Sequence, residues 1–226
     1  ALRRDRLRAL PRAGEARGLA LVALACAMQA LGLRADVLAL QGWSVIAMLF
    51  GLSLTLLGGP LTRALALPIG YLAFMLTFPP FVMNRLSFAL KEVTVRVAAQ
   101  AAAWLGVALQ RSGMTLWVTG GALEIDNPCS GLRSLLAMLA TGVLLAALLR
   151  DGAWRRVLLV ALAVPLAMAG NALRITLLVV TAHYVGIRRA VGLFHDVSGY
   201  LTYGLSLAGL LVVFALLRPR REEASP

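Results

Sequence analysis

The sequence predicts an all-α polytopic membrane protein, and three observations lead to this fold class. Hydrophobic residues make up 60% of the chain, well above the roughly 45–50% that is typical of soluble globular domains. Charged residues account for only 14%, and the mean hydropathy is +0.84. Apolar runs recur along the chain, most of them near the roughly 20 residues that a helix needs to cross the hydrocarbon core. A soluble domain is therefore excluded.

Six apolar runs are expected to form transmembrane helices, at about residues 18–33, 37–57, 64–83, 132–149, 157–184 and 196–217. The first run is interpreted as a membrane anchor, because no small-x-small cleavage site follows it. The expected organisation is a basic cytoplasmic segment at 1–17, a single integral membrane domain at 18–217 and a cytoplasmic tail at 218–226.

The net charge of +12 comes from basic residues that cluster in short segments beside the apolar runs. Such clusters orient membrane proteins, since segments rich in Lys and Arg stay on the cytoplasmic side. Both termini and the 150–156 loop are therefore expected inside the cell. The charge indicates no nucleic-acid partner, and the lipid bilayer is the expected environment.

Residues 86–110 form a long helical segment that is too polar for an ordinary span. Glu92, Arg96 and Gln100 follow one another at intervals of four, so they form one stripe in which Glu92 and Arg96 can pair. We expect an interfacial or re-entrant amphipathic helix on the outer face. The alternative is a spanning helix whose stripe faces other helices.

The next segment, Thr115–Ile125, predicts a small extracytoplasmic β-hairpin. It combines β-prone residues with Gly120-Gly121, a dipeptide that favours a tight turn, although an irregular loop is the alternative. The hairpin would deliver the chain to Cys129 at the outer membrane face.

Cys129 is the candidate nucleophile. Asp126 or Asn127 is expected to cap a helix with Pro128 at its first position, which places the thiol on the opening turn. Free N–H groups there favour the thiolate. The alternative is a small buried hydrophobic residue. Because Cys26 and Cys129 form no Cys-x-x-Cys pair, neither a metal site nor a cofactor is expected.

Two polar residues interrupt the fifth apolar run. Asn171 and Arg174 are three apart and share one helix face. An arginine inside a membrane costs at least ~2.5 kcal/mol, so such residues tend to line a cavity or bind a ligand, although a snorkelling or purely structural arginine is the alternative. The rise along the helix places Arg174 roughly 25 Å from Val157, toward the outer interface.

His195 is the candidate base, since it stands at the start of the last run on the same outer side. Imidazole is the usual partner of a nucleophilic cysteine, and Asp196 or Ser198 is positioned in the sequence to orient it. His183 competes for this role, because it ends the preceding helix.

Three motifs occur in order across the membrane helices: Pro-Cys-Ser-Gly-Leu-Arg-Ser, Asn-Ala-Leu-Arg and His-Asp-x-x-Gly. Over about residues 65–217 this order resembles the exosortase/archaeosortase family. The resemblance implies an integral membrane cysteine transpeptidase with Cys129 as nucleophile, Arg174 as catalytic arginine and His195 as general base. The positions expected to bind substrate or to support these three residues are Asn171, Asp196, Ser130 and Arg133.

The resemblance also implies the substrate and the location. Membrane-anchored proteins with a C-terminal sorting signal, composed of a short motif, a hydrophobic helix and a basic tail, would be cleaved at the outer face of the cytoplasmic membrane. The alternatives from other classes are a transporter in which Arg174 and Asn171 bind an anion, and a non-catalytic assembly factor for exopolysaccharide or surface layers.

Overall fold

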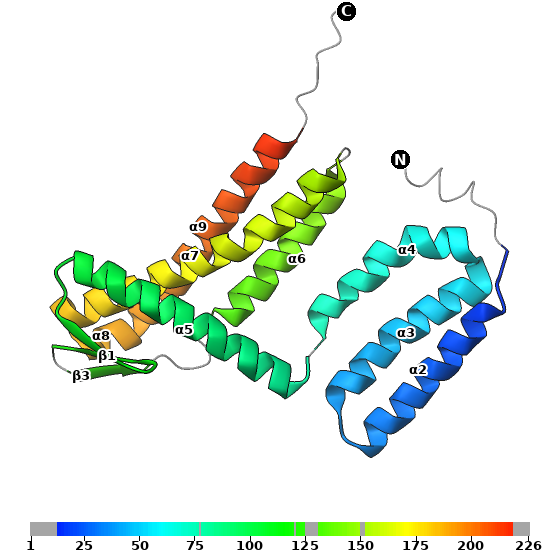
Figure 1. Cartoon of the computed structure of the whole chain (residues 1–226), viewed down its shortest axis with the longest axis horizontal. Coiled ribbons are helices and arrows are strands. Elements are labelled where there is room, and N and C mark those ends of the chain that lie inside the picture. Colours follow the sequence, from blue (N-terminus) through cyan, green and yellow to red (C-terminus); the bar gives the residue numbers. More distant parts are fainter. Residues whose placement is uncertain (1–12, 77, 120, 125–130, 150–151, 219–226) are drawn as a thin grey trace, which may run out of the picture. The chain divides into compact units, whose positions relative to one another are not determined.

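The computed structural model of the chain describes residues 13–76, 78–119, 121–124, 131–149 and 152–218. Its tertiary contacts divide into two compact units, Ala1–Val82 and Met83–Pro226. Each unit is built almost entirely of helices, and the second also holds a small sheet (Figure 1).

The first unit consists of α2 (Arg17–Arg34), α3 (Leu38–Leu57), α4 (Gly59–Tyr71) and the 3-10 helix η1 (Leu72–Met75). Glycines let α2 and α3 approach closely, because a methyl group at Gly18 would lie 2.2 Å from Thr55 Oγ1. Their polar side chains pair with each other, as where Ser44 Oγ donates to Gln29 Oε1 at 2.5 Å. This unit is a packed helical hairpin followed by α4.

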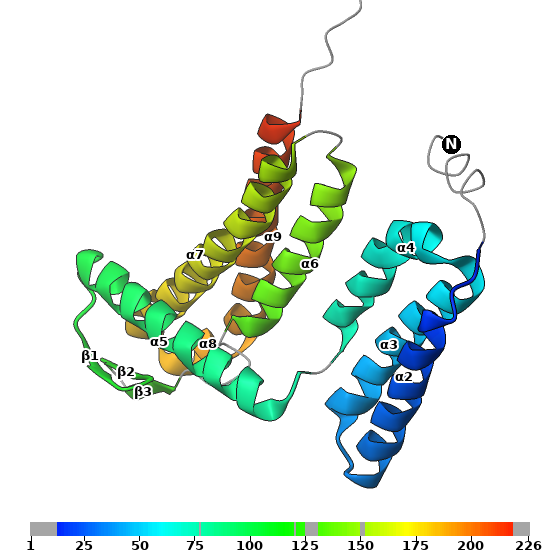
Figure 2. The ribbon, with the colours of Figure 1, turned by 45° about the vertical axis from the view of Figure 1, so that its right-hand side comes forward.

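The second unit is organised around α6 (Leu132–Leu148), α7 (Ala153–Val185) and α9 (Leu193–Leu217), which pack side by side (Figure 2). Their contact is filled by apolar side chains, with Met138 and Leu159 fully buried beside Leu210. At one end of this bundle, the starts of α6 and α9 lie beside the C-terminal half of α7, which continues past them (Figure 1). The short helix α8 (Ile187–Val191) joins α7 to α9 there.

A three-stranded antiparallel sheet lies at the same end, formed by β1 (Leu109–Ser112), β2 (Thr115–Val118) and β3 (Gly121–Glu124) in that spatial order. The predicted hairpin is confirmed as β2 and β3, but Gly121 is not in the turn, because it begins β3 opposite Val118. Strand β1 is an addition, because residues 109 and 110 were expected in the helix 86–110. Gly106, at φ 80°, follows the end of that helix, and Gly113, at φ 61°, turns β1 into β2.

Helix α5 (Pro80–Trp104) crosses α7 rather than running beside it, in both views (Figures 1 and 2). Its surface has three faces. Residues such as Val95 and Ala98 are buried, Arg96 pairs with Glu92 on a polar face, and Val97 and Trp104 are 52% and 80% exposed on an apolar face. A helix at a membrane interface contacts protein, water and lipid in this way, and the interfacial or re-entrant placement of this segment stays a prediction.

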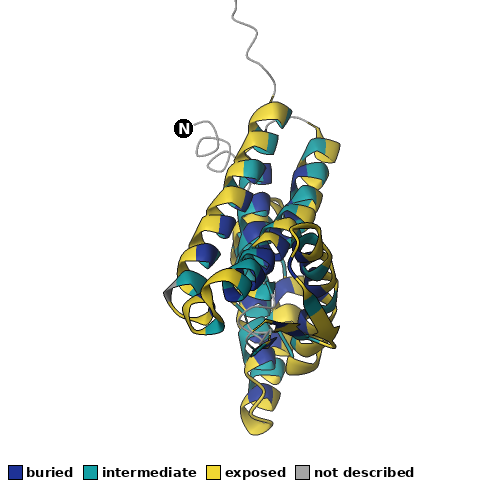
Figure 3. Cartoon of the chain, turned by 90° about the vertical axis from the view of Figure 1, so that its left-hand side faces the viewer, coloured by how far each residue is buried: buried dark blue, intermediate teal, exposed yellow. Residues whose placement is uncertain are grey.

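The expected count of about six spans is not confirmed. In the described residues, four helices are long and apolar enough to cross a membrane, namely α2, α3, α7 and residues Phe194–Leu217 of α9. A fifth span exists only if α4, η1 and α5 form one bent crossing, and α6 is a shorter apolar helix of 17 residues. Many large apolar side chains face outward, so the outer surfaces of the helices are largely exposed (Figure 3).

The run 64–83 was wrong as a single straight helix. Helix α4 gives way to η1 at Leu72, and α5 begins only at Pro80. Pro79 and Pro80 supply no backbone N–H, and a proline also disfavours helical conformation in the residue before it. The helix therefore breaks inside the apolar run.

Candidate functional site

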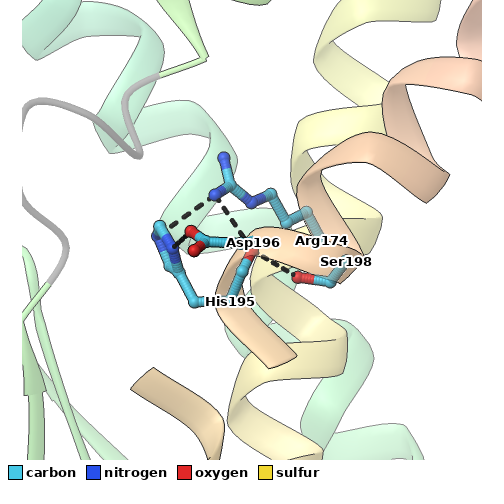
Figure 4. A network of polar contacts seen from close by, with 4 residues as sticks. All are labelled: Arg174, His195, Asp196 and Ser198. Carbon is cyan, nitrogen blue, oxygen red and sulfur yellow. Dashed lines mark hydrogen bonds and ion pairs between the residues drawn. The ribbon is translucent and has the colours of Figure 1, made fainter. Parts of the chain in front are cut away.

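Arg174 and His195 meet at the end of the bundle that carries the sheet (Figure 4). Arg174 lies on α7 and His195 on the first turn of α9. Arg174 Nη2 donates to His195 Nε2 at 3.1 Å and to the His195 carbonyl oxygen at 3.2 Å. One nitrogen of the guanidinium therefore holds both the ring and the backbone of the histidine.

Asp196 binds the other nitrogen of the same ring. His195 Nδ1 lies 3.0 Å from Asp196 Oδ1, and the arginine can only donate to Nε2. A neutral His195 is therefore the tautomer with its proton on Nδ1 and its lone pair on Nε2. The His195 side chain is 25% exposed and that of Asp196 is 73% exposed, so the cluster opens to the outside through the carboxylate.

Gly199 on α9 packs directly against the guanidinium of Arg174. A methyl group at this position would lie 3.1 Å from both Cζ and Nη2 of Arg174, which is closer than ordinary van der Waals contact. Arg174 Nε is buried and has no hydrogen-bond partner in the described part of the chain. Because Gly199 has no side chain, the guanidinium of Arg174 can pack against the backbone of α9.

Asn171 lies one turn before Arg174 on α7 and is only 6% exposed. It packs directly against the backbone at the start of α6, since a methyl group at Gly131 would lie 2.5 Å from Asn171 Nδ2. Gly131 has a φ of 75°, a conformation that favours glycine. The spacing prediction that Asn171 and Arg174 share a face is confirmed, because both line one small cavity between α6, α7 and α9.

Helix α6 begins later than expected. Its first residue is Leu132 and its N-terminal cap is Gly131, so Pro128 is not its first position and the cap is neither Asp126 nor Asn127. Gly131 adopts a left-handed conformation, with a φ of 75°, directly before the first helical residue. Cys129, like Ser130, lies outside the described residues and precedes this helix.

Two other predicted residues, Arg133 and His183, lie outside the Arg174–His195 cluster. Arg133 is exposed on the first turn of α6, and no contact joins it to Arg174 or His195. His183 ends α7, where its ring packs edge-on against Tyr184 at 4.7 Å and its buried Nδ1 has no partner among the described residues. Of the two histidines, only His195 contacts Arg174. No group of three His, Cys, Asp or Glu residues in the described chain could hold a metal ion.

Two residues of the site were not singled out from the sequence. Gly131 and Gly199 shape the site through their lack of a side chain, although both stand inside the motifs Pro-Cys-Ser-Gly and His-Asp-x-x-Gly. Glycines at fixed places in polar motifs were the available signal.

Fold and site together define a multi-pass membrane protein with an Arg-His-Asp cluster at one end of its helix bundle. The family model described as transmembrane exosortase matches residues 1–212, so the chain belongs to the transmembrane exosortase family. The match begins well before residue 65, and therefore includes the first unit. Searches of curated proteins and of solved structures found no match.

Proposed function

We propose that this chain is a cysteine transpeptidase or protease that removes the C-terminal sorting signal of membrane-anchored substrate proteins. The observation that carries the proposal is the contact of Arg174 with His195, 3.1 Å between Nη2 and Nε2, in a family of transmembrane exosortases. A guanidinium and an imidazole held together at a bundle end are the groups that thiol acyl transfer needs besides the thiol itself.

Chain connectivity supports Cys129 as the third member. Gly131 packs on Asn171, one turn from Arg174, and Cys129 is only two residues earlier in the sequence. Two peptide units reach at most about 7 Å. Cys129 therefore stands within that reach of Gly131, which supports it as the third member of the site.

In the first half of the reaction, the Cys129 thiolate attacks the carbonyl carbon of the scissile peptide bond. A carbon–sulfur bond forms and the carbonyl π electrons move onto oxygen. Arg174 is suited to stabilise this oxyanion, because Nη2 is engaged by His195 while Nη1 makes no hydrogen bond within the described chain. The thiol proton passes to His195 Nε2, which gives up its hydrogen bond from Arg174 Nη2 to accept it. His195 then returns this proton to the leaving nitrogen as the carbon–nitrogen bond breaks.

The second half releases the substrate from the enzyme. The thioester carbonyl is attacked by an amine or by water, and His195 Nε2 accepts the proton of this nucleophile. The carbon–sulfur bond then breaks and the Cys129 thiolate is restored. Asp196 stabilises the imidazolium through Nδ1 in both halves, as the carboxylate of a catalytic triad does. No metal or cofactor is required by this sequence of steps.

The proposed location is the outer face of the cytoplasmic membrane. Arg155 and Arg156 are on the first turn of α7, which runs from Ala153 to Val185, whereas Arg174 is in its C-terminal half. Likewise, His195 is on the first turn of α9, and the basic C-terminal tail follows the end of this helix in the sequence. Positive-inside orientation then puts the site outside. Labelling of single cysteines at Gly152 and Arg188 tests this, with only the second expected to react with an impermeant reagent.

The function is tested by co-expression with a reporter that ends in an extended segment, one apolar helix and a basic tail. Loss of the tail in the presence of the wild-type chain, followed by mass spectrometry of the new C-terminus, is the expected result. The Cys129→Ala protein should insert in the membrane and leave the reporter intact. An assembly factor or an anion transporter would be indifferent to this substitution.

A further inference from the structure

We propose that the outer edge of strand β3 binds the extended segment of the substrate as an added strand, next to the residues that cleave it. This inference rests on the proposed function and specifies how its substrate is held. Main-chain pairing to a sheet edge is a general way to bind an extended peptide, because it satisfies the peptide backbone without demanding a particular sequence.

The register shows which backbone groups of β3 point away from the sheet. Val118 and Gly121 flank a two-residue turn, so the Val118 carbonyl accepts from the Gly121 N–H across the turn. Hydrogen-bonded and non-bonded pairs alternate along an antiparallel ladder. Gly121 and Leu123 therefore face β2, while the N–H and C=O groups of Ala122 and Glu124 face outward.

These outward groups are available for pairing. Strand β3 is an edge of the sheet, whose order is β1-β2-β3. Ala122 and Glu124 are both exposed, and within the described chain their outward backbone groups make no hydrogen bond. The strand contains no proline, so every position can donate.

The sheet is fixed beside the Arg174–His195 cluster by its apolar face. Leu116, Val118 and Leu123 are buried in one core cluster together with Ile175, which follows Arg174 on α7. Phe194, which precedes His195 on α9, is partly buried and packs against this cluster. The apolar contacts that fix β3 therefore include the direct chain neighbours of both Arg174 and His195.

Chain order distinguishes β3 from the other edge of the sheet. Glu124 stands five residues before Cys129, whereas β1 is separated from Cys129 by the two other strands. Strand β3 is thus the strand that leads directly to the thiol in the sequence, and a substrate strand paired with it can extend past its end. A strand on β1 would lie on the opposite edge of the sheet from β3.

Disulfide cross-linking tests the pairing without any need for cleavage. Ala122→Cys is placed in a protein that lacks both native thiols through Cys26→Ala and Cys129→Ala, and single cysteines are moved along the reporter's extended segment. Directly opposite residues on paired strands have Cβ atoms about 4.5–5.5 Å apart, so cross-links are expected only at alternate reporter positions. Gln110→Cys is the matched control, because Gln110 and Ala122 flank Trp117 in the same row of the sheet.

Cross-links at alternate positions from Ala122→Cys, with none from Gln110→Cys, support the proposal. Cross-links at consecutive positions, from Gln110→Cys alone, or from neither protein overturn it. Since this protein has no nucleophile, the pattern is independent of tail removal by the wild type, which tests the proposed function separately.

A kinetic measurement adds a second test on the cleaving enzyme. Ala122→Pro removes one outward N–H of β3, and Arg111→Pro removes the equivalent outward N–H of β1. Losing one backbone hydrogen bond to the substrate should raise the KM of Ala122→Pro about three- to ten-fold with kcat unchanged, while Arg111→Pro keeps the wild-type KM. Equal KM values in the two proteins contradict strand addition. Glu124→Pro, which removes the other outward N–H, replaces Ala122→Pro if the latter does not insert.

Discussion

The two units of this chain use glycine and polar residues differently. In the first unit, Gly18 and Gly51 bring the backbones of α2 and α3 into contact, and polar side chains such as Thr55 bond to carbonyl groups of their own helix. In the second unit, Gly131 and Gly199 make room for the polar side chains of Asn171 and Arg174. Glycine therefore builds a helix pair in one unit and a site in the other.

The two units also differ in whether their buried polar groups have hydrogen-bond partners. The buried Ser44 of the first unit is satisfied by Gln29 and by a backbone carbonyl. In the second unit the buried Nε of Arg174 has no partner in the described chain, although burying an unpaired polar group is costly. This unpaired group supports the proposal that the functional site lies in the second unit.

The largest expected effect comes from removing the reacting groups. Cys129→Ala, Arg174→Ala and His195→Ala should each lower the rate of reporter tail removal by at least about 10²-fold, because groups that act as one unit fail together. Ser44→Ala, in the first unit, and His183→Ala, in the last turn of α7, should stay near the wild-type rate. The measurement is the initial rate at equal membrane levels. A loss with His183→Ala but not with His195→Ala would transfer the role of base.

Gly131→Ala is next in magnitude, because it introduces both backbone strain and a clash 2.5 Å from Asn171 Nδ2. Gly106→Ala is the matched control: its φ of 80° is equally unfavourable for alanine, but nothing lies within 4 Å of the added methyl group. Both variants should lose about 1–2 kcal/mol of stability from strain, and only Gly131→Ala should also lose most of its activity. Equal activities would show that the contact of Gly131 with Asn171 does not position the site.

Gly199→Ala should have a smaller effect that is confined to catalysis. The methyl group would push the guanidinium by a few tenths of an ångström from its 3.1 Å contact, and misplacement of a catalytic group by 1 Å costs about 10²-fold. We expect a fall in kcat of about ten-fold. Gly204→Ala on the same helix meets nothing within 4 Å and should be silent, so similar rates for the two variants would argue against a positioning role for Gly199.

The smallest effect is expected in the first unit, where the Gly59 N–H donates to Glu15 Oε1 at 2.9 Å and so caps α4. Glu15→Ala should cost about 1 kcal/mol, a fall of about 2–4 °C in Tm for a chain of this size. Thermal unfolding in detergent measures this fall, and the rate of tail removal should not change. A large loss of activity would mean that the first unit does more than anchor the protein.

Local spacing predicted several of these contacts correctly. The three-residue interval between Asn171 and Arg174 and the four-residue interval between Glu92 and Arg96 fix which side chains share a face, because helical geometry is regular. The hairpin followed from Gly120-Gly121 in the same way. The meeting of Arg174 with His195, by contrast, depends on how α7 packs against α9, so only the family resemblance indicated it.

The errors arose where local patterns are ambiguous. Residues 105–109 carry no polar side chain and continue the helical pattern of α5, yet Gly106 follows the end of the helix and Leu109 begins β1. Likewise, Pro128 is a good first residue for a helix, but Gly131 adopts a left-handed conformation and delays the start of α6 to Leu132. A short apolar run does not distinguish a helix from a strand, and a cap signal does not exclude a later start.

The central claim is that Cys129 forms a thioester with the substrate beside Arg174 and His195. Capture of this intermediate tests it most directly, by intact-mass analysis of the chain after co-expression with the reporter. The account predicts an adduct on Cys129 with the mass of the reporter without its tail, which neutral hydroxylamine releases and which Cys129→Ala lacks. Tail removal by Cys129→Ala at the wild-type rate, with no adduct on the wild-type chain, would contradict the account.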